Sequence, residues 1–303
     1  MLRPTLLLAA AFLAVPLHAQ APTIPDARGA ECLIRANATP TSWLIEGYDP
    51  FDRAIPEGTF GVTFVNEGSG ECRFTPRFEL VQPFGLSKGA GQPIGYALLN
   101  MTDSQDVTPR AGRTQRNPSQ RMLKLGANGS RTLLYKLVAD PNDVRDAGIF
   151  TQDVTIEAQD ESFRSLGGTR IVLGINVLPS ARIGLAGAYT MNDGHAVVDL
   201  GDLRPGVAPV PLQLRVASTG SYDLNVTSAN SGRLRLGSSD WYVPYNMAIG
   251  GNSVNLTSAR TISGTTDRGL RREALPIQFL IGDTSDRRAG VYSDVVSISV
   301  TAR

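Results

Sequence analysis

Three observations in the sequence predict an all-β protein made of two β-sandwiches in tandem. The chain has 303 residues with 31 Gly, 19 Pro and 42% hydrophobic residues, a turn-rich composition with enough apolar side chains for two cores. Short stretches alternate apolar and polar residues, as half-buried strands do, and no stretch has a convincing helical period. AGVYSDVVSISV at residues 289–300 is a near copy of AGIFTQDVTIEA at 147–158, and Leu275 and Leu133 each lie fourteen residues before these copies begin. The chain therefore holds two copies of one β-unit, 142 residues apart.

Residues 1–20 form a predicted signal peptide. Arg3 supplies the positive charge, residues 6–15 the apolar core, and 17–19 or 19–21 a small-residue cleavage site. The apolar run is too short to cross a bilayer as a helix, so an uncleaved anchor is the less favoured alternative. No later stretch resembles a transmembrane helix. We therefore expect an exported mature chain without a transmembrane segment.

The chain has two cysteines, Cys32 and Cys72. In an oxidising compartment an even pair is typical of a disulfide, which here closes a loop of about forty residues. Two free thiols are the alternative. A metal site is disfavoured, because the mature chain keeps only His195 and has no CxxC motif. We expect one disulfide and no metal or other cofactor.

The first unit is predicted to span residues 21–178. Residues 20–31 are short and proline-broken, so we expect a flexible lead-in there. Residues 83–93 are expected to form a Gly-rich loop, and residues 100–120 a long polar surface loop. Apolar alternation predicts strands at 32–36, 43–51, 60–64, 72–80, 96–99, 122–125, 133–138, 150–158 and 169–177.

The second unit is predicted to span residues 179–303, after a boundary at Pro179. Residues 212–216 point their apolar side chains one way and residues 222–226 return after the turn STGS, which predicts a hairpin. The block WYVPY at 241–245 is expected to be sandwich core plus an edge, with a binding platform as the alternative. Further predicted strands lie at 183–185, 234–236, 254–256, 275–281 and 289–300.

The two copies of the repeat differ in the segment that comes after each of them. After the first copy, residues 169–177 form another apolar strand that can complete the sandwich within the chain. No strand comes after the second copy, so we expect an incomplete sandwich with an apolar groove and an unpaired edge. Strand addition by another chain would cover that groove. The side chains predicted to line the groove are those of Leu212, Leu214, Val216, Val296, Ile298 and Val300. The alternative is that these residues form the core of a closed sandwich.

Several motifs resemble the spore coat protein U-like pilin domain of archaic chaperone–usher pili. In the first unit they are GYDPF, the second cysteine, LLYKLVAD and AGIFTQDVTIEA. In the second unit they are DLGDLRPG, STGSYDLNVTSANSGRL, YVPYNM, LPIQFLIGD and AGVYSDVVSISV. The resemblance covers nearly all of the mature chain, with the terminal AG-x-Y motif and its LPIQF partner as the more specific part. It implies an incomplete immunoglobulin-like sandwich that a periplasmic chaperone holds and a neighbouring subunit completes with a donor strand.

The chain departs from an ordinary shaft subunit of this family. It has two units, its second unit has no cysteine, and its lead-in is too short and proline-broken to act as a donor strand. These departures resemble a tip adhesin, with an adhesin-like sandwich at 21–178 and a pilin-like sandwich at 179–303. The resemblance implies a cell-surface subunit that mediates attachment or biofilm formation, with a periplasmic chaperone, an outer-membrane usher and a neighbouring pilin as partners. The alternative is a self-contained secreted binding or envelope structural protein.

Candidate adhesive residues lie in loops of the first unit. Apolar side chains in Gly- and Pro-rich loops can make a binding surface, and the candidates are Tyr48, Phe51, Phe84, Leu86 and Ile94. The alternative is that these residues fold back and cap the core.

The sequence disfavours catalysis and nucleic-acid binding. The 29 basic and 28 acidic residues nearly balance, so no basic surface is predicted. His195 lies in a polar turn without a nucleophile motif, and no G-x-S-x-G motif is present. Asp193, Asp199 and Asp202 lack the dense oxygen spacing of a calcium loop and are expected to lie in a solvated turn.

Overall fold

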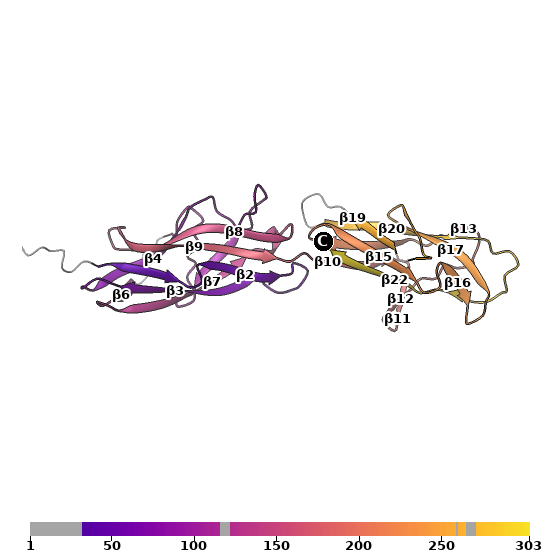
Figure 1. The fold of residues 1–303 in the computed structure, drawn as a ribbon, viewed down its shortest axis with the longest axis horizontal. Coiled ribbons are helices and arrows are strands. Elements are labelled where there is room, and N and C mark those ends of the chain that lie inside the picture. Colours follow the sequence, from indigo (N-terminus) through magenta and orange to yellow (C-terminus); the bar gives the residue numbers. More distant parts are fainter. Residues whose placement is uncertain (1–31, 116–121, 259, 265–270) are drawn as a thin grey trace, which may run out of the picture.

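The computed structural model describes residues 32–115, 122–258, 260–264 and 271–303. These residues form an all-β fold, and none of their helical turns is long and apolar enough to span a membrane. Figure 1 shows two groups of strands arranged end to end, the first indigo to pink and the second orange to yellow. Each group has its own cluster of buried hydrophobic side chains. Two β-sandwiches in tandem, as the sequence predicts, are confirmed; the predicted signal peptide and lead-in up to residue 31 lie outside the described residues.

The first sandwich packs a four-stranded sheet on a five-stranded sheet. The four-stranded sheet has the order β1-β3-β7-β5, and the five-stranded sheet has the order β2-β9-β8-β4-β6. The strands pair antiparallel except β2, which runs parallel to β9. The strands are β1 (Ile34–Ala38), β2 (Ser42–Tyr48), β3 (Glu57–Asn66), β4 (Cys72–Leu80), β5 (Tyr96–Asn100), β6 (Leu123–Leu125), β7 (Ser130–Ala139), β8 (Gly148–Gln159) and β9 (Ser165–Val177), with a short 3-10 turn, η2 (Pro141–Asp143), before β8.

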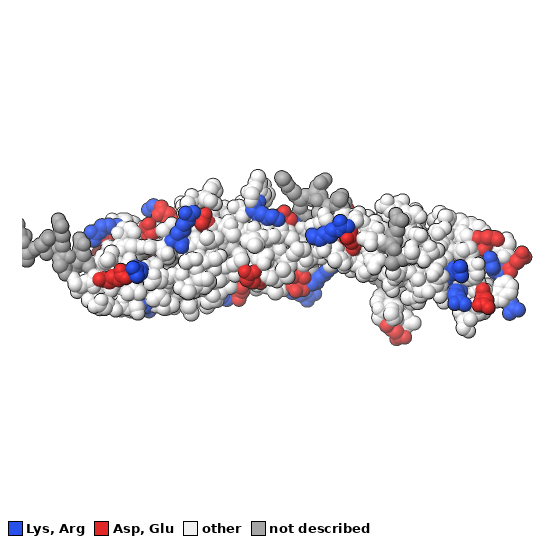
Figure 2. Space-filling model, in the orientation of Figure 1, with Lys and Arg blue, Asp and Glu red and all other residues white. Residues whose placement is uncertain are grey.

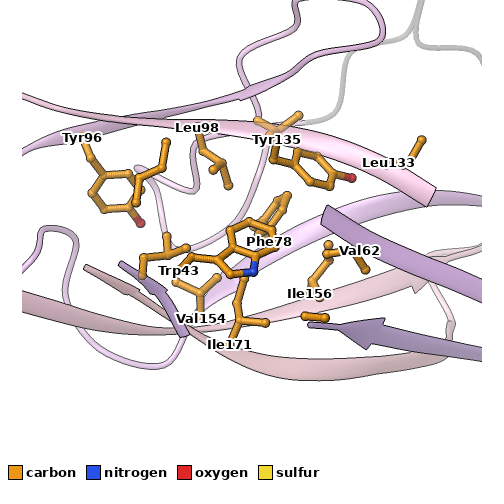
Figure 3. Close-up of a cluster of buried hydrophobic side chains, with 14 of the residues drawn as sticks. Trp43, Val62, Phe78, Tyr96, Leu98, Leu133, Tyr135, Val154, Ile156 and Ile171 are labelled. Atoms are coloured by element: carbon orange, nitrogen blue, oxygen red, sulfur yellow. The ribbon is translucent and has the colours of Figure 1, made fainter. Parts of the chain in front are cut away.

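Aromatic rings from both sheets meet in the first core. Trp43 of β2 is fully buried; its ring stacks on Phe60 and Tyr135, with centroids 5.3 and 6.0 Å apart, and meets Phe78 edge-on at 6.3 Å. Figure 3 shows Trp43, Phe78 and Tyr135 surrounded by aliphatic side chains of both sheets. Rings in these geometries contribute roughly 0.5–1.5 kcal/mol a pair beyond the area they bury.

Two of these rings carry a buried polar atom without a hydrogen-bond partner in the described part of the chain, Trp43 Nε1 and Tyr135 Oη. The Tyr135 hydroxyl is buried and has no hydrogen-bond partner in the described part of the chain, so we expect Tyr135→Phe to stabilise the first sandwich by about 1 kcal/mol at pH 7. Burial, and secondarily the charge of Asp103, raises the pKa of Tyr135. A raised folded-state pKa gives stability that is complete below the unfolded value of about 10 and falls as pH rises above it. Denaturant unfolding between pH 7 and 11 should therefore show a smaller alkaline loss for Tyr135→Phe than for the parent. The same change at the half-buried Tyr242 is the control, and an equal alkaline loss in parent and Tyr135→Phe would contradict the expectation.

The second sandwich packs a larger sheet on a three-stranded sheet. The larger sheet has the order β10-β14-β20-β17-β16-β21, with β13 and β18 paired to β20 and β17, and the smaller has the order β19-β15-β22. A separate hairpin, β11–β12, follows β10. The strands are β10 (Ala181–Gly187), β11 (Thr190–Asn192), β12 (His195–Val197), β13 (Gly206–Val207), β14 (Leu212–Ser218), β15 (Tyr222–Ser228), β16 (Arg233–Leu236), β17 (Tyr242–Ile249), β18 (Asn252–Val254), β19 (Arg260–Gly264), β20 (Arg271–Ile281), β21 (Tyr292–Ser293) and β22 (Val296–Ala302).

The two sandwiches repeat one strand topology. The order β1-β3-β7-β5 corresponds to β10-β14-β20-β17, and β8-β4-β6 corresponds to β22-β15-β19. The registers agree as well, since Leu133 pairs with Val62 and its repeat equivalent Leu275 pairs with Leu214. The 142-residue repeat in the sequence is therefore a repeat of structure. In the described part of the second sandwich, β9 and β2 have no counterpart paired to β22.

The hairpin predicted for residues 212–226 is wrong. β14 pairs with β10 and β20, whereas β15 pairs with β19 and β22 in the facing sheet. The turn between them carries the chain across the sandwich. Period-two alternation reports which face of a strand is buried and not which strand lies beside it, so the two arrangements have the same sequence pattern.

The strand predicted at residues 289–300 is split in two. β21 pairs with β16 of the larger sheet, and β22 pairs with β15 of the smaller one. Asp294 lies at the break, where its carboxylate accepts hydrogen bonds from Ser228 Oγ at 2.5 Å, Asn230 N at 2.9 Å and Tyr245 Oη at 2.7 Å. This carboxylate is bonded to groups on both sheets and holds the chain where it crosses between them.

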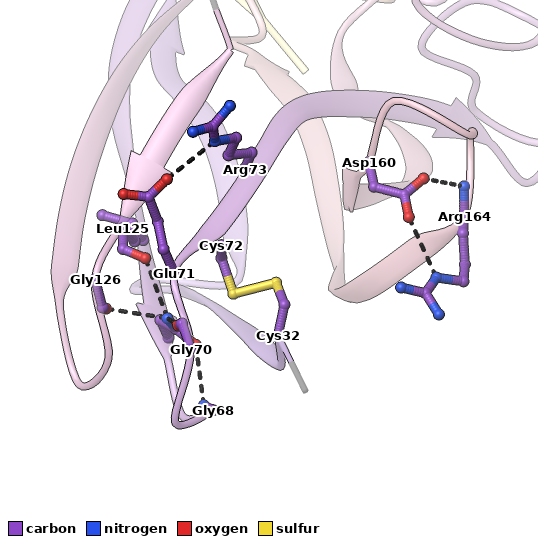
Figure 4. Close-up of a disulfide and its surroundings, with 11 residues drawn as sticks. Cys32, Gly68, Gly70, Glu71, Cys72, Arg73, Leu125, Gly126, Asp160 and Arg164 are labelled. Carbon is purple, nitrogen blue, oxygen red and sulfur yellow. Dashed lines mark hydrogen bonds and ion pairs between the residues drawn. A yellow bond between two sulfur atoms is a disulfide. The ribbon is translucent and has the colours of Figure 1, made fainter. Parts of the chain in front are cut away.

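Cys32 and Cys72 form the predicted disulfide. Cys32 precedes β1 of one sheet and Cys72 begins β4 of the other, so the bond joins the two sheets at the end far from the second sandwich (Figure 4). Beside it, Asn66 Nδ2 donates to the carbonyl oxygens of Gly70 and Leu125 at 2.7 and 3.1 Å. The turns at this end are tied together by one covalent bond and one buried amide.

The two sandwiches meet around Thr219, which is buried. Its hydroxyl accepts a hydrogen bond from Ser180 N at 2.9 Å, and its carbonyl accepts one from Ala147 N of the first sandwich at 3.2 Å. Beside this contact, Arg182 of β10 forms an ion pair with Asp52 of the first sandwich, with 2.5 Å between Nη2 and Oδ1. The linker, residues 178–180 between β9 and β10, is therefore flanked by contacts that join the two sandwiches.

Candidate functional site

β22 occupies the place in the second sandwich that β8 occupies in the first. Ile156 of β8 lies opposite Phe78 of β4, and its repeat equivalent Ile298 lies opposite Val226 of β15. The pairing on this side of the two strands is the same. Any difference between β8 and β22 must therefore come from their other edge.

That other edge is covered in β8 and not in β22. β8 pairs along its length with β9, with Val154 opposite Ile171 and Phe150 opposite Ile175, and β2 covers the far side of β9. Within the described residues, β22 pairs with β15 alone. Its second edge carries main-chain N–H and C=O groups without a strand partner, the kind of edge that pairs with another chain.

Burial of the side chains reflects the missing strand. Val154, Ile156 and Ala158 of β8 are fully buried, whereas their equivalents on β22 are half-buried. The facing edge strands differ in the same way, because the inward side chains of β1 are buried and those of β10 are half-buried. The half-buried set consists of Val296, Ile298 and Val300 on β22 and Ala181, Ile183 and Leu185 on β10.

A groove of about 1440 Å³ lies between these two edges. Its floor is made by inward-facing side chains of β14, β16, β17 and β20, and its sides by β10 and β22. Four of the six residues predicted for the groove line it, namely Leu212, Leu214, Val296 and Ile298. The other two lie close by, Val216 buried on β14 opposite Ile183 and Val300 half-buried on β22.

Two parts of the groove lining were not predicted from the sequence, β10 on one side and the segment after β12. Ile183 and Leu185 alternate along β10, but a two-residue pattern does not reveal which edge it occupies. Val198, Leu200 and Leu203 come after β12, line the groove and pack half-buried against the second core. Val198 and Leu200 are apolar residues two positions apart, which was the available signal in the sequence. Gly201 and Asp202 then break the alternation before Leu203.

Asp294 and Tyr245 both line the groove, together with the charged residues Asp199, Asp202, Arg287 and Arg288. Burial, and then the hydrogen bond to the Asp294 carboxylate, raises the pKa of the Tyr245 phenol. The phenol therefore stays protonated and donates to that carboxylate at neutral pH. The polar groups of Asp294 and Tyr245 are already used in hydrogen bonds to each other. Along β22, by contrast, main-chain N–H and C=O groups of the second edge have no strand partner among the described residues.

The candidate adhesive residues lie at the end of the first sandwich that faces the second. Leu86 and Ile94 are fully buried and Tyr48 nearly so, and Phe84 stacks on Tyr96 with centroids 4.8 Å apart. Phe51 is half-buried with the Arg182 guanidinium 5.9 Å from its ring centroid. Burial thus favours the alternative in which these residues cap the core and the junction, and it speaks against Leu86 and Ile94 as contact residues.

The remaining predicted positions behave as ordinary structure. In the block 241–245, Val243 and Tyr245 are buried core residues of β17. His195 is exposed in the β11–β12 hairpin. No group of three or more His, Cys, Asp or Glu side chains in the described residues is arranged to hold a metal ion.

No protein-family model matches the sequence, and no curated protein matches it. Solved structures of similar fold include the chaperone–tip adhesion subunit complex CsuC–CsuE of Acinetobacter baumannii, at 13% identity and a TM-score of 0.41, covering 77% of this chain and 91% of that one. The CupB6 tip adhesin of Pseudomonas aeruginosa is similar at 10% identity and a TM-score of 0.39, covering 89% and 94%. CfaE, the adhesive subunit of CFA/I fimbria of enterotoxigenic Escherichia coli, is similar at 13% identity and a TM-score of 0.38, covering 91% and 83%. At these identities and TM-scores, no residue role and no argument is taken from the likeness.

Proposed function

We propose that this protein is a non-enzymatic surface subunit of a chaperone–usher pilus, acting as a tip adhesin that mediates attachment or biofilm formation. The observation that carries the proposal is a comparison of β22 with β8, which has the same motif and register: the inward side chains of β8 are fully buried, whereas those of β22 are half-buried and its second edge has no strand partner among the described residues. A second chain that adds a strand to β22 would bury that edge. Adding a strand from one subunit to the sheet of the next forms only non-covalent bonds, so this assembly needs no catalytic group.

The groove favours an extended strand over any other occupant. An unpaired sheet edge gives a strand main-chain hydrogen bonds, and the pockets behind it select alternate side chains. Left open, the same edge promotes aggregation. We infer that a periplasmic chaperone covers the groove first, that an outer-membrane usher receives the subunit, and that a neighbouring pilin then supplies the lasting strand.

The first sandwich supplies a template for that strand. β9 runs antiparallel to β8 and inserts Ile171, Leu173 and Ile175 between the two sheets, where all three are buried. The partner strand is proposed to do the same against β22, with large aliphatic side chains at every second position. The Asp294 position corresponds to Gln152 of β8, which is buried opposite Leu173.

The sequence supports the route proposed for the subunit. The predicted signal peptide at residues 1–20 would deliver the chain to the periplasm, and the motifs that resemble the spore coat protein U-like family support assembly by a chaperone and an usher. In this proposal, residues 21–178 are the adhesive sandwich and residues 179–303 the pilin-like one.

The test is to give the second sandwich a strand of its own. A copy of residues 160–178, the turn and strand that come after β8, is appended after Arg303 so that it can fold back along β22. We expect the parent to aggregate or to need a chaperone, and the extended chain to be monomeric with a second cooperative unfolding transition. Size-exclusion chromatography and calorimetry measure both.

The matched control carries Ile171→Ser, Leu173→Ser and Ile175→Ser in the appended copy only, and we expect it to behave like the parent. A parent that is already a stable monomer with two cooperative transitions, unaffected by the extension, would overturn the proposal. The protein would then be a self-contained secreted binding module.

A further inference from the structure

Three arginines share the outer face of the larger sheet in the second sandwich. Arg182 of β10 lies beside Ala217 of β14, which lies beside Arg272 of β20. One row further along, Gly184, Arg215 and Ala274 are neighbours. Strands lie about 4.8 Å apart, so the three arginine Cα positions fall within about 10 Å. We call these three residues the arginine patch.

The patch is one-signed. The outward positions of β10, β14, β17 and β20 carry no carboxylate among the described residues. Glu273 of β20 points inward, where Tyr222 Oη donates to it at 2.5 Å. On the face drawn in Figure 2, by contrast, basic and acidic side chains lie side by side.

One member of the patch already binds carboxylates. Arg182 pairs with Asp52 and, at 3.7 Å, with Asp49, both from the first sandwich. Arg215 and Arg272 are exposed and form no ion pair with any described residue. Two guanidinium groups therefore remain available beside a third that is half satisfied from the junction.

The surface between the arginines is a shallow depression of about 450 Å³. Gly184, Ala217 and Ala274 line it between the arginines, and a hydrogen atom and two methyl groups are too small to fill it. The aliphatic stems of the arginines form its rim, with the charged groups above. The depression thus combines a small apolar floor with a rim of three guanidinium groups, and its one acidic lining residue, Glu273, accepts a hydrogen bond from Tyr222 on the inner side of the sheet.

We propose that the arginine patch binds an acidic polysaccharide through the carboxylate or sulfate groups of its sugars. A guanidinium group presents a planar fork of N–H donors that matches a carboxylate or sulfate. The apolar floor suits the C–H face of a sugar ring. A linear polymer can place successive anionic groups on Arg215 and Arg272 while its rings cross the depression.

The setting favours a polysaccharide over an acidic peptide. The patch lies on the outer face of the sheet, and the free edge of β10 borders the groove, so a peptide backbone lying over the patch gains no strand-pairing bonds there. The depression has no deep pocket for a large apolar anchor. Recognition would therefore depend on repeated anionic groups along the ligand, held over the shallow apolar floor of the depression. This inference does not depend on whether the groove accepts a strand.

The experiment measures binding of the full chain to four immobilised probes at about 0.05 and 0.3 M salt. The probes are polygalacturonate (carboxylated), heparin (sulfated), neutral dextran and poly-glutamate. We expect binding to at least one acidic polysaccharide that weakens with salt, no binding to dextran, and weaker binding to poly-glutamate. The double variant R215Q/R272Q should lose about tenfold or more in affinity, a loss of about 1.4 kcal/mol or more, because both charged hydrogen-bond donors to the anionic groups are removed.

The control variant R73Q/R164Q removes the same net charge from the first sandwich, where both arginines are already paired with carboxylates. It should change affinity less than about twofold, which separates a site from a general charge effect. Equal losses in both double variants, absence of binding to both acidic polysaccharides, or poly-glutamate binding as tight as theirs would each overturn the proposal. Preference for heparin or polygalacturonate identifies the anionic group.

Discussion

Ile156→Ala is expected to destabilise the first sandwich by about 2–5 kcal/mol, whereas Ile298→Ala should cost the second sandwich less than about 1 kcal/mol. The two isoleucines occupy the same position of the repeat and lie opposite equivalent partners. Ile156 is fully buried between β4 and β9, so its truncation leaves a cavity. Ile298 faces the open groove and is half-buried, so water already reaches the space that truncation would create.

Denaturant unfolding followed by two probes, one in each sandwich, measures both costs in one chain, at a protein concentration low enough to keep the unextended chain monomeric. The contrast should disappear when the groove is filled. In the chain extended with residues 160–178, Ile298→Ala should cost about 2 kcal/mol or more, because the side chain would then be covered as Ile156 is. An Ile298→Ala cost as large as that of Ile156→Ala without any extension would show that the groove is closed in the free protein.

The repeat could be predicted because it rests on alternation, which the sequence displays directly. Val154 and Ile156 on β8, and Val296 and Ile298 on β22, each fall two residues apart, and their face follows from the pleat alone. The predicted groove residues Leu212, Leu214, Val296 and Ile298 lie together for the same reason. The two inward faces of a sandwich meet whichever strands are neighbours.

The features that the sequence could not predict depend on partners far along the chain. The break at Asp294 requires hydrogen bonds from Ser228 and Tyr245, which no local pattern announces. The burial of Leu86 and Ile94 arises because the loop that carries them folds back on itself and against β8, with Leu86 N and O bonded to Ile94. A glycine- and proline-rich composition reads as an exposed loop until such contacts are known. The proximity of Arg215 and Arg272 could not be predicted from the sequence, because it depends on the pairing of β14 with β20.

Replacing both cysteines with alanine, Cys32→Ala and Cys72→Ala, is expected to destabilise the first sandwich by about 4 kcal/mol. The bond closes a loop with a sequence separation of 40, and the loop-entropy relation gives about 4 kcal/mol for that length. Cys72 is fully buried between the sheets, so small losses of packing add to the entropic cost. A domain of this size has about 5–15 kcal/mol in total, so the loss is a large fraction of its stability.

The position of the bond decides which unfolding transition should move. It joins β1 to β4 at the end of the first sandwich that lies far from Thr219 and the linker. Only the first transition should therefore shift in the double variant, while the second, measured in the extended chain, stays where it was. A matched pair of alanine changes at exposed residues of the same turns, Ser69→Ala and Ser162→Ala, controls for the substitution itself. Equal shifts of both transitions would mean that the contacts at Thr219 and Arg182 couple the two sandwiches into one cooperative unit, because a constraint released at one end can reach the other only through that junction.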